Sequence, residues 1–209
     1  MQHYSFLLLI LASINAPSCT NGIPIDNIEE PPELLPEDEA FANVFKALDG
    51  IWEGEFIIYE DTQQAAKQGL DLEDLNLTSI NKPSLKEINR IQVRQEYTSE
   101  SPYFQRVRIR DFYPDSGKEE ISIGVNKVQN GKMWCVVHKP EETVIHNGSR
   151  EGTNTIIWQR NEKKPQRVEF FKETVGAEYY EIIGWGYYAG DDLSLTPRLW
   201  FYSKYERKD

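Results

Sequence analysis

The stretch from Leu48 to Tyr59, Leu-Asp-Gly-Ile-Trp-Glu-Gly-Glu-Phe-Ile-Ile-Tyr, decides the fold class because the spacing of apolar residues changes within it. Its large apolar residues Trp52, Phe56 and Ile58 fall on one side of an extended chain, which predicts a first strand over residues 51–59. Upstream, acidic residues at 37–39 suit the first turn of a helix that Asp49-Gly50 would end. The apolar residues of that predicted helix recur at helical spacing, and they are Phe41, Val44, Phe45 and Leu48.

Downstream of residue 89 the chain alternates between short strand patterns and turn residues. Asn130-Gly131 lies between two of these patterns, where Asn-Gly is a strong hairpin signal. Residues 61–89 break the pattern and predict a helical or loop insertion after the first strand. About ten short strands at hairpin spacing predict an all-β fold, which we take as an antiparallel up-and-down β-barrel rather than a sandwich. The later strands are predicted over residues 91–98, 104–113, 119–128, 132–138, 143–146, 155–160, 167–172, 178–188 and 198–205.

The segment Gly50-Ile51-Trp52, together with basic residues around the last strand, resembles the calycin superfamily of lipocalins and fatty-acid-binding proteins. The resemblance implies that the indole of Trp52 closes one end of the barrel under a guanidinium, which either Arg198 or Arg207 could supply. It also implies that the insertion is similar to the helical lid of fatty-acid-binding proteins. A nitrobindin-like haem domain begins similarly and would require a pocket histidine. We expect His138 and His146, the candidates, to lie on the surface at strand ends.

The N-terminal residues predict export. Residues 1–19 contain the apolar run Phe6–Ala12 and are predicted to be a signal peptide, although no Lys or Arg precedes that run. Cys19 follows Ala16-Pro17-Ser18 and resembles the lipid-modified cysteine of a bacterial lipoprotein; simple cleavage nearby, without lipid, is the alternative. Residues 20–36 have the acidic, proline-rich composition of a linker, and residues 37–209 are assigned to the barrel domain. The protein is therefore expected to be secreted, or anchored to a membrane through Cys19.

The charge pattern argues against a nucleic-acid partner. The net charge of −11 would repel a polyanion. Arg106, Arg108 and Arg110 alternate with Val107 and Ile109, and the apolar side needs a core. We therefore expect the arginine row to face solvent. The opposite orientation would create a positive pocket for an anionic head group, with Arg94 contributing from the preceding strand.

Large aromatic residues gather in the last two predicted strands and are the candidate lining of a ligand cavity. Trp185 lies between Gly184 and Gly186, which leaves space beside the indole. Core filling is the competing explanation, because a barrel of this size either fills its interior or encloses one small ligand. The predicted ligand-binding residues are Trp52, Arg94, Tyr180, Trp185, Tyr187, Trp200 and Tyr202.

The sequence provides no catalytic motif, and we predict no catalytic residue, metal ligand or cofactor. Cys135 lies in an apolar strand pattern and is expected to be a buried, inert thiol. Three positions separate it from His138, so the two would face opposite sides of one strand. His138 and His146 without a tight spacing are a weak metal signal.

The favoured function is therefore the binding of a small apolar or amphipathic ligand inside the barrel. One alternative is a calycin-type enzyme, such as a chromophore lyase or isomerase. It would require a titratable pair in the cavity, for example Glu53 or Glu181 near Arg94. Another alternative is a structural or interaction lipoprotein without a ligand.

Overall fold

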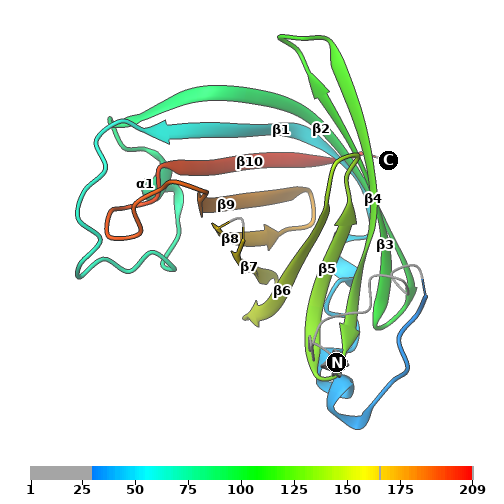
Figure 1. Cartoon of the computed structure of the whole chain (residues 1–209). Helices are drawn as coiled ribbons and strands as arrows, with labels where there is room; N and C mark the ends of the chain where they lie inside the picture. The colour runs from blue at the N-terminus through cyan, green and yellow to red at the C-terminus, as the bar shows by residue number, and fades with distance from the viewer. Residues whose placement is uncertain (1–29, 165, 209) are drawn as a thin grey trace, which may run out of the picture.

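The computed structural model describes residues 30–164 and 166–208. Ten antiparallel strands form a closed barrel in which each strand pairs with its neighbours in sequence and β1 pairs with β10 (Figure 1). The predicted all-β up-and-down barrel is confirmed. The strands are β1 (Gly50–Asp61), β2 (Leu85–Ser101), β3 (Phe104–Tyr113), β4 (Lys118–Gln129), β5 (Lys132–His138), β6 (Thr143–Glu151), β7 (Thr155–Lys163), β8 (Gln166–Val175), β9 (Tyr179–Tyr187) and β10 (Leu199–Lys208).

The predicted N-terminal helix is two short 3-10 helices, η2 (Pro36–Phe41) and η3 (Lys46–Leu48). Asn43 separates them with a φ of 61°, a left-handed conformation that a continuous helix does not allow. Asp38 in η2 is buried, accepting hydrogen bonds from the backbone N–H of Leu35 at 2.9 Å and of Gly131 at 2.6 Å. The bond from Gly131 ties η2 to the turn between β4 and β5.

One end of the barrel is closed by a plug around Trp52. The indole is fully buried and donates its N–H to the carbonyl of Leu48 at 2.7 Å. The guanidinium of Arg207 lies 4.2 Å from the ring centroid, so Arg207 makes the stacking contact that the sequence left open between two arginines. Arg198 instead pairs with Glu60 and Asp191.

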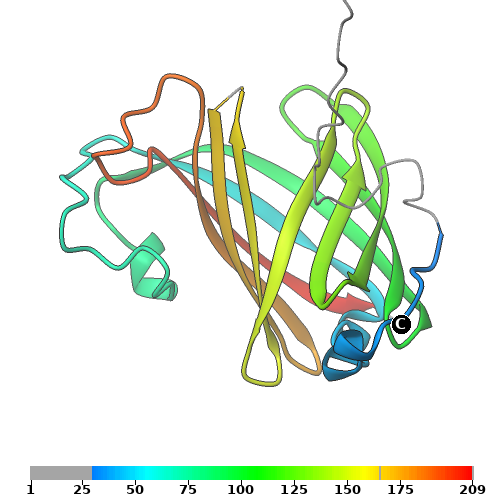
Figure 2. The same ribbon diagram turned by 60° about the horizontal axis from the view of Figure 1, so that its bottom comes forward.

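The same arginine explains why Gly50 begins the first strand. The φ of Gly50 is 118°, which favours glycine, and a Cβ on this residue would lie 2.7 Å from a guanidinium nitrogen of Arg207. That side chain also donates hydrogen bonds to the carbonyls of Asp49 at 2.5 Å, Ala47 at 3.2 Å and Ala177 at 2.9 Å. One arginine of β10 therefore contacts both η3 and β1 at the closed end. Figure 2 shows the N-terminal helical segment at this end of the barrel, beside the end of β10.

The insertion between β1 and β2 packs on the outside of the barrel. It contains the short helix α1 (Leu77–Ile80), and it lies beside the loop that leads into β10 (Figure 1). Leu75 and Ile80 are buried against Trp185 and Trp200, which project from the outer faces of β9 and β10. The expectation that the insertion resembles the lid of a fatty-acid-binding protein is therefore wrong, because its buried side chains, Leu75 and Ile80, cover the outer wall of the barrel.

The predicted signal peptide, Cys19 and residues 20–29 of the predicted linker lie outside the described residues. Within residues 30–164 and 166–208, no helix is both long enough and apolar enough to span a membrane.

Candidate functional site

The barrel encloses two adjoining chambers lined by inward-facing side chains. The deep chamber has a volume of about 200 Å³, and the mouth chamber about 330 Å³. Five lining residues are shared between them: Phe56, Gln95, Ile109, Lys139 and Phe171. This barrel has ten strands and is therefore wider than an eight-stranded barrel, in which side chains fill or nearly fill the interior. The interior is therefore the candidate ligand site.

Aromatic and aliphatic side chains from eight strands form the walls of the deep chamber. Inward alternation along each strand positions them, since successive side chains point to opposite faces of the sheet. Phe56 and Phe171 both stack on Phe201, at centroid distances of 5.7 and 5.4 Å. The chamber's mainly apolar lining comprises Phe56, Tyr97, Val107, Ile109, Val137, Val144, Trp158, Phe171, Tyr180 and Ile182.

Glu173 is the carboxyl group of the deep chamber. It lies on β8 opposite Ile182 of β9, and it accepts a hydrogen bond from the indole N–H of Trp158 at 2.8 Å. Burial raises the pKa of Glu173 to about 7, while its hydrogen bonds with Trp158 and Tyr180 act in the opposite direction. A carboxyl group that titrates near neutral pH inside an aromatic chamber is typical of a functional site.

A chain of polar contacts extends from Glu173 across the chamber. Tyr180 hydrogen-bonds with both Glu173 and Tyr97, and the Tyr97 hydroxyl donates to Gln95 at 3.0 Å. Burial raises the pKa values of Tyr97 and Tyr180 well above their usual value, with the charge of Glu173 as the next cause. Both phenols therefore stay neutral and supply oriented hydroxyl groups.

Towards the mouth, Glu169 connects three strands by polar contacts. It accepts a hydrogen bond from the Tyr188 hydroxyl at 2.8 Å and lies 3.4 Å from Nε2 of His146 and 3.6 Å from Arg160. Burial opposes ionisation of Glu169, but these partners together lower the pKa of its carboxyl. Arg160 is 4% exposed and also pairs with Glu142 and Glu162, so its charge is fully engaged.

Lys139 and Asp111 complete the polar part of the lumen. Both line the mouth chamber, and Lys139 also borders the deep one. Burial raises the pKa of Asp111, and the positive charge of Lys139 partly offsets this. Asn126, which donates to Gln105 at 2.9 Å, leaves its carbonyl oxygen buried with no hydrogen-bond partner among the described residues. An oriented polar group of this kind is available to a bound molecule.

The predicted ligand-binding residues divide between the two faces of the barrel. Trp52 and Tyr180 lie inside, in edge contact at a centroid distance of 5.8 Å, and Tyr180 lines the deep chamber. Arg94 lies outside and pairs with Glu53 and Glu96. The expectation that the other aromatic residues line the cavity is wrong, because their strand positions direct them outward; contact between them and a ligand stays a prediction. These outer residues are Trp185, Tyr187, Trp200 and Tyr202.

Contacts with neighbouring segments account for the outer aromatic residues. The Trp185 indole donates to the Leu72 carbonyl at 2.7 Å, and Tyr187 donates to the Leu195 carbonyl at 2.6 Å. Lys82 lies 4.3 Å from the centroid of the Trp200 ring. These side chains thus hold the insertion and the β9–β10 loop against the barrel wall.

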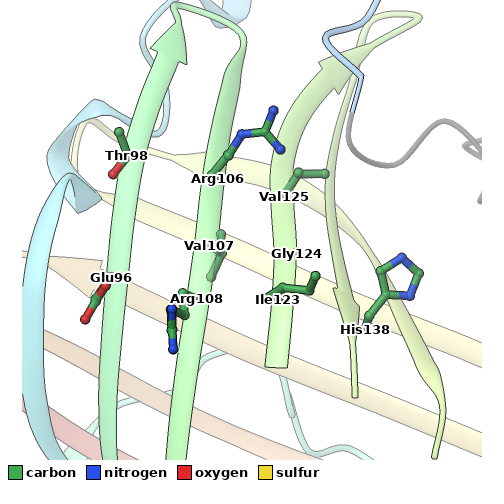
Figure 3. Close-up of a pocket in the computed structure, with 9 residues that line it drawn as sticks. All are labelled: Glu96, Thr98, Arg106, Val107, Arg108, Ile123, Gly124, Val125 and His138. Carbon is green, nitrogen blue, oxygen red and sulfur yellow. The ribbon is translucent and has the colours of Figure 1, made fainter. Parts of the chain in front are cut away.

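The arginine row faces outward as expected. Arg106 pairs with Glu100, and Arg110 with Glu119. Figure 3 shows Arg106 and Arg108 on β3 and His138 on β5 beside a surface cavity of about 290 Å³. This cavity lies outside the barrel, and Ile123 on its border is 50% exposed. The row therefore supplies no positive pocket within the lumen.

The structure separates the two histidines of the β5–β6 region. His138 lies on the outer face and contacts the hydroxyl of Thr143 at 2.8 Å. His146 lines the deep chamber, and its ring makes an edge contact with Phe171 at 5.6 Å. The expectation that His146 lies on the surface is wrong, because its register opposite Cys135 places it on the inner face.

Cys135 also lines the chamber and forms no disulfide within the described part of the chain. Burial raises the pKa of its thiol, and the nearby Glu173 adds to this effect, so the reactive thiolate is disfavoured. Among residues 30–164 and 166–208, no group of three or more His, Cys, Asp and Glu side chains has the arrangement to hold a metal ion.

Glu173 is one of the lumen residues that sequence analysis missed. The eighth strand was predicted to end at Lys172, whereas it continues to Val175. Extending the alternation of Phe171, Glu173 and Val175 would have identified an acid on an apolar face. The pair proposed for an enzyme, Glu53 or Glu181 near Arg94, is not in the cavity, because the register places all three outside.

Comparisons with known proteins found matches among solved structures. No family model matches the chain, and no curated protein matches it. Matching solved structures include the redesigned β-barrel b11L5F_LGL, with a TM-score of 0.38 and 11% identity over 80% of this chain and 97% of that one. Two others are EF1p2_mFAP2b bound to DFHBI (TM-score 0.37, 9% identity, 80% and 99% covered) and the redesigned β-barrel mFAP1 bound to DFHBI (0.36, 9%, 79% and 100%).

Proposed function

We propose that the protein binds a small apolar or amphipathic molecule inside its barrel. The supporting observation is the pair of adjoining chambers, whose walls are mainly apolar, include several aromatic rings and carry a few convergent polar groups. The outer surface also has hollows, and the one beside Arg94 is bordered by paired charges, such as Arg94 with Glu53. Ligand burial is greater in the lumen, where strands surround a molecule on several sides.

A blocking variant tests this proposal. Ile109 borders both chambers, so Ile109→Phe would fill part of the shared space. Ile123 lies on the neighbouring strand, facing solvent, and Ile123→Phe is the matched control. Binding of the fluorescent probe 1-anilinonaphthalene-8-sulfonate and of naphthalene would be measured by fluorescence and calorimetry, with melting curves for each variant.

We expect Ile109→Phe to weaken binding of at least one probe about tenfold or more, since a loss of roughly 1.4 kcal/mol of binding free energy lowers the affinity tenfold. Ile123→Phe should leave the affinity unchanged. Equal weakening by both variants, or no binding of either probe by the parent protein, would favour the structural role without a ligand.

We further propose that the chain is a member of the calycin superfamily. Support comes from the plug at the closed end, where Trp52 follows Gly50 on the first strand and Arg207 of the last strand stacks on its ring. A short helical segment precedes the first strand, as the resemblance implies.

We also propose that the protein is exported, on the basis of the apolar run Phe6–Ala12 and the proline-rich acidic residues that follow. Intact-mass measurement of protein recovered from the source cells tests this. Loss of about the first 18 residues together with a diacyl adduct on Cys19 would support the assignment of the protein as a lipoprotein. A mass matching the full, unmodified chain would contradict export by this route.

A further inference from the structure

We propose that the deep chamber accepts a protonated amine carried on a small aromatic body, with the carboxylate of Glu173 as its anchor. This inference rests on the proposed function of binding within the lumen. It specifies the chemical class of ligand, and four features of the chamber support it.

The first feature is the unused hydrogen-bonding capacity of Glu173. A carboxylate has about four lone-pair sites, whereas Glu173 uses one oxygen for the Trp158 indole and a second contact for Tyr180. Neighbouring atoms only partly cover its side chain, and it borders the chamber. The remaining acceptor sites are therefore available to a donor that enters the chamber.

The second feature is the ring of aromatic side chains around that carboxyl. The negative faces of aromatic rings attract cations, most strongly where water is excluded. Five aromatic residues line the same chamber as Glu173, so a cation there would gain ring contacts in addition to the ion pair. They are Phe56, Tyr97, Trp158, Phe171 and Tyr180.

The third feature is the balance of charges in the lumen. An anionic head group would require a cation that is not already engaged, yet Arg160 is surrounded by three glutamates and His146 lies against Glu169. Lys139 borders both chambers but is exposed, and its positive charge partly offsets the burial that raises the pKa of the nearby Asp111. Within residues 30–164 and 166–208, Glu173 forms no ion pair with a lysine, arginine or histidine side chain, whereas Lys172 beside it pairs with Glu151 on the outer face. The deep chamber therefore favours a positive ligand.

The fourth feature is size. The deep chamber, at about 200 Å³, is smaller than the roughly 300–1,000 Å³ typical of pockets for drug-sized molecules. A single ring with a short amine side chain suits such a space, and a larger body would extend into the mouth chamber.

Burial raises the pKa of Glu173 to about 7, so a bound cation would stabilise its ionised form near neutral pH.

Three probes that differ only in the head group test the ligand class. 2-Phenylethylamine, 2-phenylethanol and 3-phenylpropionate share a ring and a two-carbon chain but carry a positive, neutral and negative group. Their affinities for the full chain would be measured by calorimetry at about pH 8, where the amine is protonated and Glu173 is largely ionised. We expect the amine to bind about tenfold or more tightly than the alcohol, and the acid to bind weakest.

Glu173→Gln isolates the anchor because glutamine retains an acceptor for the Trp158 indole and loses the charge. We expect this variant to lose the preference for the amine while keeping the affinity for 2-phenylethanol. Glu181→Gln is the matched control, since it removes one carboxylate from the outer face of the adjacent strand. That control should behave like the parent protein. Melting curves verify that each variant is folded.

The outcomes distinguish this inference from the proposed function. Equal or tighter binding of the alcohol or the acid would overturn the amine class and leave binding within the lumen standing. A preference for the amine that survives Glu173→Gln would overturn Glu173 as the anchor. If none of the three probes binds, the amine class is refuted, and the naphthalene measurement with Ile109→Phe decides the proposed function separately.

Discussion

The inner and outer walls of strands β8 to β10 carry similar aromatic residues but differ in what surrounds them. On the inner wall, Phe171 and Tyr180 face the deep chamber, where space remains beside them. On the outer wall, Phe170 and Trp185 stack at a centroid distance of 5.6 Å beneath the insertion, with Trp185 only 7% exposed. Aromatic content therefore does not identify a ligand site: the inner rings border a cavity, and the outer rings attach a segment of the same chain.

Glycine placement contributes to this difference. Gly184 faces inward opposite Phe171, and a Cβ at that position would lie 2.5 Å from the Phe171 ring and 2.6 Å from the Phe170 carbonyl. The absent side chain allows the Phe171 ring to lie against the β9 backbone. The flanking residues Ile183 and Trp185 face outward and have no such requirement. The glycines beside Trp185 thus make room for an inner ring rather than for a ligand at the indole.

The largest expected effect is on the outer wall. Trp200 is 1% exposed and packs in the cluster that includes Leu75 and Ile80. Trp200→Ala should lower the free energy of unfolding by about 3–5 kcal/mol, because it leaves a cavity beneath the insertion. Chemical denaturation would measure this loss, and calorimetry on the folded variant should find unchanged affinity for probes in the lumen. A selective loss of affinity with little change in stability would instead place the ligand site on the outer wall.

The next effect concerns the inner wall and depends on pH. Glu173 has a pKa of about 7 in the folded protein against an ordinary value of 4.5. The fold therefore favours the protonated form of Glu173, and the stability that this group contributes is fully present below about pH 4.5 and is lost as the pH rises through about 7. Glu173→Gln should remove this decline, which is on the order of 3 kcal/mol.

Denaturation of both proteins between pH 4.5 and 8 measures that effect, with Glu181→Gln on the outer wall as the control. Burial raises the pKa values of the neighbouring phenols of Tyr97, Tyr180 and Tyr205 and of the thiol of Cys135, so these groups stay neutral over this pH range. A parent profile that coincides with that of Glu173→Gln would show that the carboxyl is freely solvated.

A smaller effect is expected at Gly184. Gly184→Ala should cost about 1–3 kcal/mol, because the new methyl group meets the backbone of Phe170 as well as the Phe171 ring. Gly186→Ala should cost less, since its Cβ would meet only the outer part of the Tyr188 ring, at 2.8 Å. Thermal melting compares the two variants. Equal costs would contradict the special role of the contact between Gly184 and Phe171.

The smallest effect is expected at Arg94. Its ion pairs with Glu53 and Glu96 lie on the solvent-exposed outer face, where such pairs contribute little. Arg94→Ala should leave the melting temperature and the affinity for 2-phenylethylamine unchanged within error. Loss of affinity would place Arg94 in the ligand site, as the sequence predicted, and would contradict its position on the outer wall.

The sequence by itself determined the architecture. Period-two alternation, the Asn130-Gly131 turn and the number of short strands predicted the barrel, because local backbone preferences and one-sided burial leave clear patterns. Gly50 and Trp52 predicted the plugged end, and the need of Val107 and Ile109 for a core predicted outward arginines. The sequence also predicted an insertion after the first strand, where residues 62–84 separate β1 from β2.

Only the tertiary structure decided which wall holds the candidate site. Strand β9 is apolar or glycine at nearly every position from Ile182 to Tyr187, so alternation could not assign its faces. The insertion decided this by covering Trp185 and Trp200, which made the outer wall a second core. The meeting of Glu173 with Trp158 and Tyr180 depends on the register of three strands, a long-range property that local sequence patterns do not encode.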